Sequence, residues 1–370
     1  MLNVLFLKKI DGVIGSLLAR MWPRPKQPGG VLSSVSRLLL IRPGGIGDAV
    51  LLAPTIGRLR EVFPMARIEV LAEKRNAGAF ALCPGIDRVL CYDRPGELWQ
   101  TLKNSYDVVI DTEQWHRLSA IVARMIRSQT KIGYGTNERR RLLSHAVDYS
   151  HDSYELNSFL ELLKPLGIEP PATTHFSFLT IPAVDQETAD NLLGTFLEKP
   201  FVVLFPGASI AERCWGIEKF RQLANRFIDE GLAVVVVGGK EDIAAGSAIV
   251  DGFCALNLTG KTSLCGTAGV LHRAQLLVSG DSGVLHIGAG LGTPTVSLFG
   301  PGIAAKWAPR GKKHVVINHN LSCSPCTRFG TTPPCPIGAK CIQDISVDEV
   351  FAAARNLLNV KHGEVDCDGV

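Results

Sequence analysis

Short apolar runs alternate with longer amphipathic stretches along the first half of the chain, from about residue 36 onward. The first run, residues 38–41, is typical of a buried strand, and a glycine-rich loop and a helical pattern at about 49–62 follow it. Strand-sized runs that alternate with helical stretches predict βαβ units and a mainly parallel sheet. Later strands of this half are expected at 68–71, 89–91, 108–110 and, more weakly, 132–134.

The same pattern begins again after a proline-containing stretch at 167–185. We therefore predict an α/β protein with two successive doubly wound domains. In such sheets ligands bind beyond the carboxyl ends of the strands, so the loops that directly follow strands are the places to search for function. Strands of the second half are expected at 201–205, 233–237, 276–278 and 295–298, and helices at 215–230 and 347–358.

Residues 2–22 repeat apolar side chains at helical spacing and precede a proline-rich linker at 23–30. A basic amphipathic helix favours a position on an anionic membrane surface. A helix packed on the protein's own body and a secretory signal peptide are the alternatives, although no small-x-small cleavage site follows. The apolar face holds Leu2, Phe6, Ile10, Val13, Ile14, Leu17 and Met21, and the opposite face holds Lys8, Asp11, Gly12, Gly15 and Ser16.

The composition narrows the class of protein. A chain of 370 residues corresponds to two domains, and 46% hydrophobic against 20% charged residues excludes a mainly disordered chain. No apolar run is long enough to cross a bilayer. The net charge of +4 is carried by the first 30 residues, so the rest lacks the basic surface of a general nucleic-acid-binding protein. Because no export signal is evident, we expect the ten cysteines to be mostly free thiols on the cytoplasmic side.

The loop after the first strand, residues 42–48, carries the first candidate chemistry. Gly44 and Gly45 let a ligand approach the backbone closely, and the helix start behind them favours negative charge. Asp48 is either a general base at the edge of a cleft or a helix N-cap. The loop is not a dinucleotide fingerprint, because Val50 stands where the third glycine belongs.

Two loops of the second half contain groups that suit a nucleotide. The loop after strand 201–205 holds Gly207 and Ser209 and leads to Arg213, whose guanidinium fits diphosphate oxygens. An ordinary surface arginine is the alternative. Glu241 follows strand 233–237 and either binds ribose hydroxyls or favours the start of a helix.

The most informative loop is 279–286, at the end of another strand. Asp281, Ser282 and Gly283 stand where a helix begins, and backbone N–H groups there form an anion site. His286 falls in the first turn of that helix, where it would donate to a phosphate or to the charge that develops on a leaving group. A structural histidine is the alternative.

A cysteine-rich loop lies outside the strand ends. Its spacing is C-x2-C-x8-C-x5-C in a segment rich in proline and glycine. This predicts a structural metal, zinc by default and iron as the alternative, ahead of free thiols and disulfides. The four residues are Cys323, Cys326, Cys335 and Cys341.

A run of three arginines lies in the first half of the chain. Such a run would meet phosphates or carboxylates of an anionic acceptor, or form an ordinary solvated face. The three residues are Arg139, Arg140 and Arg141.

Taken together, these motifs resemble glycosyltransferase family 9, the ADP-heptose:lipopolysaccharide heptosyltransferases, over about residues 37–358. The strongest part is Asp-Ser-Gly-Val-Leu-His at 281–286 together with the segment 294–301. The remaining segments that carry the resemblance are 41–48, 59–64, 206–207, 213–215, 238–239 and 258–264.

The resemblance implies a GT-B fold, in which two Rossmann-like domains face a cleft, here with an N-terminal amphipathic helix. The acceptor would bind the first domain and the nucleotide sugar the second. The expected divisions are an arm and linker at 1–30, the acceptor domain at 31–183, the nucleotide-sugar domain at 184–345 with the cysteine loop at 323–341, and a closing helix and tail at 346–370.

The resemblance also implies inversion at the anomeric carbon, without a catalytic metal or other cofactor. Asp48 matches the family's aspartate that deprotonates the acceptor hydroxyl. The family often has lysine where Arg213 stands and proline where Gly216 stands. The donor-binding residues implied are Gly207, Ser209, Arg213, Glu241, Thr262, Asp281, Ser282, Gly283 and His286, and the acceptor-binding candidates are Gly44, Gly45, Arg139, Arg140 and Arg141.

We therefore predict a peripheral transferase on the cytoplasmic face of the bacterial inner membrane, bound through residues 2–22, that moves heptose from ADP-heptose to a lipopolysaccharide core or a related anionic lipid-linked glycan. The alternatives are a relative that uses another nucleotide sugar, a nucleotide-sugar epimerase of the same fold, and a nucleotide-binding module without catalysis. Retention of Asp48 and His286 favours an active transferase. No nucleic-acid partner is expected.

Overall fold

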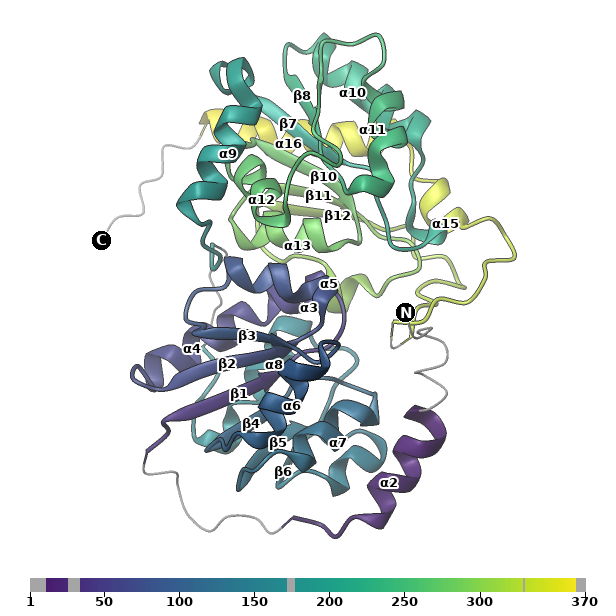
Figure 1. Cartoon of the computed structure of the whole chain (residues 1–370). Helices are drawn as coiled ribbons and strands as arrows, with labels where there is room; N and C mark the ends of the chain where they lie inside the picture. Colours follow the sequence, from purple (N-terminus) through teal and green to yellow (C-terminus); the bar gives the residue numbers. More distant parts are fainter. Residues whose placement is uncertain (1–10, 26–33, 172–176, 329, 364–370) are drawn as a thin grey trace. The chain divides into compact units, whose positions relative to one another are not determined.

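The computed structural model describes residues 11–25, 34–171, 177–328 and 330–363. The chain divides into two compact units, unit 1 (Met1–His175) and unit 2 (Phe176–Val370), and each contains one six-stranded sheet (Figure 1). The strand order is β3-β2-β1-β4-β5-β6 in unit 1 and β12-β11-β10-β7-β8-β9 in unit 2, which is the same doubly wound order twice. All pairings within both sheets are parallel, so the predicted α/β class with two Rossmann-like units is confirmed.

Unit 1 contains six strands, with helices between most of them. The strands are β1 (Arg37–Ile41), β2 (Arg67–Ala72), β3 (Arg88–Cys91), β4 (Val108–Asp111), β5 (Thr130–Tyr134) and β6 (His145–Val147). The helices are the π-helical turn η1 (Asp11–Gly15), α2 (Ser16–Met21), α3 (Ile46–Leu51), α4 (Ala53–Val62), α5 (Lys74–Ala77), η2 (Gly78–Leu82), α6 (Pro95–Lys103), α7 (Arg117–Met125), η3 (Asn137–Arg141), α8 (Glu155–Glu161) and η4 (Lys164–Leu166).

Unit 2 repeats this arrangement. Its strands are β7 (Phe201–Phe205), β8 (Ala233–Val236), β9 (Leu256–Asn257), β10 (Leu276–Gly280), β11 (Thr295–Leu298) and β12 (His314–Ile317). Its helices are α9 (Ala183–Leu193), η5 (Gly194–Glu198), η6 (Ala211–Arg213), α10 (Ile217–Asp229), η7 (Lys240–Asp242), α11 (Ile243–Val250), α12 (Leu264–Arg273), α13 (Gly283–Gly290), α14 (Ala304–Trp307), α15 (Lys340–Gln343) and α16 (Val347–Gly363).

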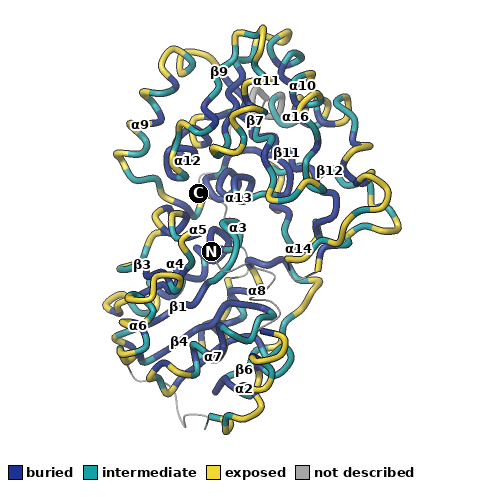
Figure 2. Tube along the Cα trace, turned by 45° about the vertical axis from the view of Figure 1, so that its right-hand side comes forward, coloured by how far each residue is buried: buried dark blue, intermediate teal, exposed yellow. Residues whose placement is uncertain are grey.

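The central strands of each sheet are buried along nearly their whole length, as expected for parallel strands covered by helices on both faces (Figure 2). All the strands predicted from apolar runs are present. The prediction missed β6, β9 and β12, which lie at sheet edges and are mostly only half-buried. β6 and β9 are short strands of three and two residues, whereas β12 contains the apolar run 315–317, which the sequence analysis did not single out.

The helix predicted at 49–62 is two helices in the structure. α3 begins earlier, at Ile46, and ends at Leu51, while α4 begins at Ala53. Pro54 lies in the first turn of α4, where a missing backbone N–H costs no hydrogen bond. Asp48 therefore belongs to a short helix of six residues that directly follows the glycine loop.

The amino-terminal arm packs on unit 1 through the face that the sequence showed as polar. Asp11 is buried and accepts a hydrogen bond from the backbone N–H of Leu118 (2.8 Å). Ala19, with Leu18 and Trp22, packs against α7. The predicted apolar face is exposed instead: the exposed fraction is 74% for Val13, 49% for Ile14, 59% for Leu17 and 71% for Met21. The remaining residues of the predicted arm, 2–10, lie outside the described residues.

Within the described residues, no helix is long and apolar enough to cross a membrane.

Candidate active site

Asp48 lies in the first turn of α3. A short glycine-containing loop joins this helix to the carboxyl end of β1. The N-cap of α3 is Gly45, not Asp48, so the carboxylate is not used as a cap. Gly44 has a φ of 111°, which favours glycine, and its N–H donates to Glu73 (3.2 Å). A Cβ at Gly45 would lie 3.1 Å from Oδ2 of Asp48. The two glycines thus leave space beside the carboxylate, whose side chain is 22% exposed.

A buried arginine faces Asp48. Arg42 Nη2 lies 3.7 Å from Asp48 Oδ1 and 3.6 Å from Glu113 Oε2. Glu113 comes from the loop after β4, the strand beside β1, and is almost fully buried. Burial works against the charge of Glu113, but the charge of Arg42, with those of His116 and Arg139, holds the pKa of Glu113 below its ordinary value. The edge of this sheet therefore holds two carboxylates, Asp48 and Glu113, beside one guanidinium.

The three consecutive arginines occupy different surroundings. Arg139 is fully buried, and its Nη2 bonds to Asp111 at 2.8 Å while Nη1 donates to Ser119 and to the carbonyl of His116. Arg140 is half-exposed and pairs with Asp148. Arg141 donates to the carbonyl of Arg20 (3.4 Å) in the arm. Arg139 thus has the surroundings of a structural residue, and we retain only Arg140 and Arg141 as candidates for an acceptor phosphate.

In unit 2, three neighbouring strands place their following loops at one edge of the sheet. β7 lies between β10 and β8. Arg213, from η6 after β7, forms an ion pair with Asp281, from the loop after β10; Arg213 Nη1 lies 3.1 Å from Asp281 Oδ2. Both side chains are largely buried, with exposed fractions of 19% and 9%. The structure thus brings together two of the residues predicted to bind the donor.

The helix that follows Asp281 begins at Gly283. Ser282 is its N-cap and accepts a hydrogen bond from the backbone N–H of Leu285 (3.2 Å). Its hydroxyl also bonds to Ser279 (2.9 Å). His286 is buried in the first turn of this helix, α13. Ser282 therefore shapes the start of α13, which directly follows Asp281, the partner of Arg213, in the sequence.

The loop after β8 is organised by Asp242 rather than by Glu241. Asp242 Oδ2 accepts a hydrogen bond from Gly239 N–H (2.8 Å). A Cβ at Gly207 or at Gly238 would come within 2.7 Å of the Asp242 carboxylate, so glycine is needed at both positions. Burial and then the charge of Glu241 raise the pKa of Asp242. Glu241 itself is exposed, as a ribose ligand must be, and its carboxylate lies over Gly239.

Two predicted donor residues, Thr262 and Ser209, lie in loops outside the Arg213–Asp281 pair. The hydroxyl of Thr262 bonds to that of Thr267 (2.8 Å) just before α12. Ser209 is exposed in the loop between β7 and η6. The neighbour Ser263 caps α12 through the N–H of Gly266 (2.9 Å). The position of Thr262 is therefore fixed by its hydrogen bond to Thr267 in the first turn of α12.

The four cysteines of the predicted metal site line one small cavity of about 20 Å³. Cys341 is buried, Cys326 and Cys335 are half-buried and Cys323 is exposed, and all four are free thiols. Burial, then the neighbouring cysteines, raises the pKa of Cys341. The N–H groups of Cys326 and Thr327 both donate to the carbonyl of Pro301, which ties this loop to the segment after β11. In the part of the chain that the structure describes, no group of three or more His, Cys, Asp or Glu side chains is gathered as a metal site.

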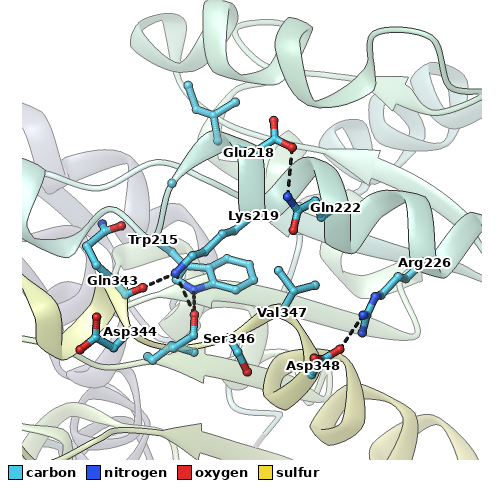
Figure 3. A pocket seen from close by; sticks show the side chains of 13 residues that line it. Trp215, Glu218, Lys219, Gln222, Arg226, Gln343, Asp344, Ser346, Val347 and Asp348 are labelled. Carbon is cyan, nitrogen blue, oxygen red and sulfur yellow. Dashed lines mark hydrogen bonds and ion pairs between the residues drawn. The ribbon is translucent and has the colours of Figure 1, made fainter.

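A pocket of about 660 Å³ lies between the start of α10 and the turn that joins α15 to α16 (Figure 3). None of the predicted donor residues lines it. Trp215 Nε1 donates to the carbonyl of Ile345 (2.9 Å), and Lys219 Nζ donates to the carbonyls of Gln343 and Ile345. The Trp of the Arg-Cys-Trp motif is therefore a buried anchor that holds the start of α10 to the chain before α16.

The sequence did not identify Arg42 and Glu113 as site residues. Arg42 belongs to the glycine loop at 42–48, but a single arginine directly after a buried strand forms no motif that would indicate a role in the site. Glu113 follows the strand predicted at 108–110, and β4 is the neighbour of β1. The rule that the ends of adjacent parallel strands meet was the signal that could have found it.

Two successive doubly wound units, each with charged side chains at the carboxyl edge of its sheet, are the architecture of the GT-B fold. A profile of glycosyltransferase family 9 (heptosyltransferase) matches residues 96–335. The chain belongs to glycosyltransferase family 9 and is a glycosyltransferase.

Individual relatives agree with this assignment. Lipopolysaccharide heptosyltransferase 2 of Escherichia coli K12 is 32% identical over 306 residues, which covers 76% of this chain and 87% of the relative. The structure of the E. coli ADP-heptose lipopolysaccharide heptosyltransferase II has a TM-score of 0.74 and 22% identity, and covers 88% of this chain and all (100%) of that one. The iron-containing dodecameric glycosyltransferase TibC of enterotoxigenic E. coli H10407 has a TM-score of 0.58 and 15% identity, and covers 90% of this chain and 78% of that one.

Proposed function

We propose that this glycosyltransferase moves heptose from ADP-heptose to a lipopolysaccharide core or a related lipid-linked glycan, with inversion and without a catalytic metal. The heptosyltransferase names of its relatives support the sugar and the acceptor class. The observation that carries the proposal is the pairing of Arg213 with Asp281 beside the start of α13. A guanidinium and a helix N-terminus at the carboxyl edge of a Rossmann-like sheet suit a diphosphate.

The reaction is a displacement at the anomeric carbon. The acceptor oxygen forms a bond to that carbon while the bond from the carbon to the diphosphate oxygen breaks, and Asp48 takes the hydroxyl proton. Arg213 and the N–H groups at the start of α13 stabilise the charge on the departing ADP. Asp48 suits the role of base because its carboxylate is partly exposed and is not used as a helix cap.

Calorimetry with ADP-, UDP-, GDP- and CDP-sugars tests the donor, followed by a transfer assay with a lipid-linked core acceptor in the presence of EDTA. We expect selective binding of ADP-heptose and transfer that EDTA leaves intact. The Asp48→Asn variant should lose about 10²–10⁴-fold in turnover and keep its affinity for ADP-heptose. The Arg213→Ala variant should lose both.

Three results would contradict the proposal. Selective binding of a different nucleotide sugar would remove the donor assignment. Conversion of the nucleotide sugar without any acceptor would indicate an epimerase. A loss of donor affinity in the Asp48→Asn variant that accounts for its loss of turnover would remove the role of Asp48 as base.

We propose further that the arm binds the inner membrane surface. The arm packs on α7 and η3 through the side that holds Asp11 and Ala19. The opposite side faces solvent and forms an apolar stripe of Val13, Ile14, Leu17 and Met21. Arg20, two-thirds exposed, lies beside the stripe, and the first 30 residues carry a net positive charge. An apolar stripe with basic neighbours suits an anionic lipid surface. A position on this surface would place the enzyme beside a lipid-linked acceptor on the cytoplasmic side.

Vesicle co-sedimentation of the full chain tests this membrane contact. The Leu17→Ser/Met21→Ser double variant should bind phosphatidylglycerol vesicles at least about tenfold more weakly, because two exposed apolar side chains no longer enter the interface. Met65 is 93% exposed and lies outside the arm, so Met65→Ser is the matched control. Equal binding by the double variant and the wild type would contradict the proposal.

We propose a structural zinc or iron ion for the four-cysteine loop. The number and type of the ligands fit, since four thiolates bind either metal and leave no open position for catalysis. The four side chains share one cavity but are not gathered to ligand distances, so the fit is one of composition and not of geometry. TibC, a structural relative, is an iron-containing protein.

Elemental analysis of the purified chain tests the metal. We expect about one zinc or iron per chain in the wild type, none in Cys335→Ser/Cys341→Ser, and an unchanged content in Cys254→Ser, a control at an exposed cysteine outside the loop. A metal-free wild-type protein with four titratable thiols in the loop would contradict the proposal.

A further inference from the structure

The guanidinium of Arg42 is fixed in orientation by its surroundings. Arg42 is 2% exposed. Its Nε donates to the carbonyl of Pro43 (2.7 Å), its Nη1 donates to the carbonyl of Thr112 (2.8 Å), and the group lies 5.5 Å from the centre of the Phe159 ring. Two nitrogens are thus held by backbone oxygens, and the direction of the third, Nη2, follows from the planar shape of the group.

Nη2 of Arg42 faces two carboxylates at nearly equal distances. Asp48 Oδ1 lies at 3.7 Å and Glu113 Oε2 at 3.6 Å. Oε1 of Glu113 accepts hydrogen bonds from the N–H groups of Trp115 (3.1 Å) and His116 (3.3 Å), which leaves Oε2 directed at Arg42. Both contacts are longer than a hydrogen bond, so neither carboxylate is tightly paired. One positive charge is shared by two negative ones.

We propose that Arg42 and Glu113 are positioning residues for Asp48: Arg42 keeps the Asp48 carboxylate ionised and oriented, and Glu113 shares the charge of Arg42 so that Asp48 stays free to accept a proton. The inference rests on the proposed role of Asp48 as base. A carboxylate that forms a close pair with arginine is a poor base, while one without a cation beside a second carboxylate would be partly protonated. The arrangement avoids both conditions.

Other titratable groups surround this cluster. Glu155 of α8 is buried and accepts hydrogen bonds from Gln114 and Tyr149. Glu73 bonds to Gly44, as described above, and His116 lies near Glu113. Tyr134 of β5 acts on Arg42 and Tyr149 interacts with Asp48. Burial lowers the pKa of Arg42, but the charges of Asp48, Glu113 and Glu155 together raise it above its ordinary value, so Arg42 stays charged.

A pH titration of the Asp48 carboxyl group tests the inference without any substrate. The readout is the ¹³C carboxyl resonance of the full chain, assigned by its absence in Asp48→Asn. Arg42→Met should move the midpoint of Asp48 upward by about one pH unit or more, because the cation is lost. Glu113→Gln should move it downward by a similar amount, because Arg42 then acts on Asp48 alone.

The exposed pair Arg58–Glu61 of α4 supplies matched controls, Arg58→Met and Glu61→Gln, which should leave the midpoint unchanged. A purely structural role for Arg42 and Glu113 would not move the midpoint in opposite directions. If Arg42→Met does not fold, the isosteric Glu113→Gln still decides, since an unchanged or raised midpoint overturns the proposal.

The acid limb of the turnover profile should move in the same directions as the titration midpoint. Opposite shifts in the titration with an acid limb that stays in place would show that the cluster works as proposed but that Asp48 is not the base. Unchanged titration midpoints combined with a large loss of turnover in Asp48→Asn would overturn the positioning roles and leave the proposed function intact. The two failures are therefore distinguishable.

Discussion

The positions of two carboxylates in unit 2, Asp242 and Asp281, require glycine at neighbouring positions, because a Cβ there would collide with the carboxylate. A Cβ at position 302 would lie 2.4 Å from Oδ2 of Asp281, a distance at which the carboxylate must move. The same oxygen forms the ion pair with Arg213. Gly302 follows the Gly-Pro segment after β11, to which the cysteine loop is bonded through Pro301. One glycine thus connects the packing of the cysteine loop to the geometry of the proposed diphosphate site.

Gly302→Ala should displace the Asp281 side chain and break its contact with Arg213. We expect the affinity for ADP to fall about tenfold or more, equal to about 1.4 kcal/mol, because the guanidinium loses the partner that orients it. Calorimetry with ADP measures the change. Gly57→Ala is the control, since nothing lies within 4 Å of a Cβ there and alanine suits a helix better than glycine. An unchanged affinity in Gly302→Ala would show that Asp281 and Arg213 do not act together on the diphosphate.

At the scale of helices and strands, the sequence predicted every interior strand and the edge strand β3, and it missed the edge strands β6, β9 and β12. Runs such as 201–205 and 276–278 are apolar throughout because both faces are covered. β5 was the weakest prediction of unit 1, because the run at 132–134 is short and contains Gly133. The strand in the structure also includes Lys131. The structure buries Lys131, whose Nζ donates to the carbonyl of Ser128, and burial lowers the pKa of Lys131 to about 8.

The candidate site could be predicted from sequence where a motif follows a strand, and not elsewhere. Asp48, Arg213 and Asp281 were found because each stands in such a motif. Arg42 and Glu113 come from two strands that are far apart in sequence, and only the order of the strands brings them together. For the arm, periodicity showed that one face is apolar but not which face packs, since the buried side depends on Asp11 and Ala19 meeting α7.

Glu138 holds the arm to unit 1. Its Oε1 accepts hydrogen bonds from Ser16 (3.1 Å) and Arg20 (2.7 Å) of α2, and its Oε2 accepts one from Arg117 (2.8 Å) of α7. Glu138→Gln should therefore loosen the arm. We expect amide hydrogen exchange in residues 11–22 to rise about fivefold, with the core strands unchanged. Exchange measured by mass spectrometry checks this, with Glu61→Gln as the control at an exposed ion pair. Equal exchange in both variants would mean that apolar packing alone holds the arm.

The same contact makes the docking of the arm depend on pH. Hydrogen bonds from Arg117 and then Arg20 lower the pKa of Glu138 to about 2, from an ordinary value of 4.5. A carboxyl group whose pKa is lower in the docked state stabilises that state above its ordinary pKa, and the stabilisation is lost as the pH falls from 4.5 toward 2. The protection of residues 11–22, measured as exchange relative to the intrinsic amide rate at each pH, should accordingly fall as the pH is lowered over this range in the wild type and change less in Glu138→Gln.

At the scale of the whole molecule, the chain repeats one doubly wound architecture, and the proposed reaction divides its chemistry between the two copies. The proposed base and its positioning residues belong to unit 1, and every residue proposed for the donor belongs to unit 2. Each unit has a sheet and an apolar core of its own. Binding of the nucleotide and proton removal should therefore be separable properties of the full chain.

ADP should consequently stabilise unit 2 alone. At about 100 times its Kd, a ligand stabilises the state that binds it by about 2.7 kcal/mol, so the slowest amides of β7 and β10 should exchange about 100-fold more slowly. Amides of β1 and β4 should keep their rates, because unit 1 contributes none of the proposed ADP contacts. Hydrogen exchange of the full chain with and without ADP measures this, with Asp48→Asn expected to behave as the wild type and Arg213→Ala expected to show little protection. Equal protection of β1 and β10 would show that the two units unfold together, and absence of protection at 279–286 would place the nucleotide elsewhere.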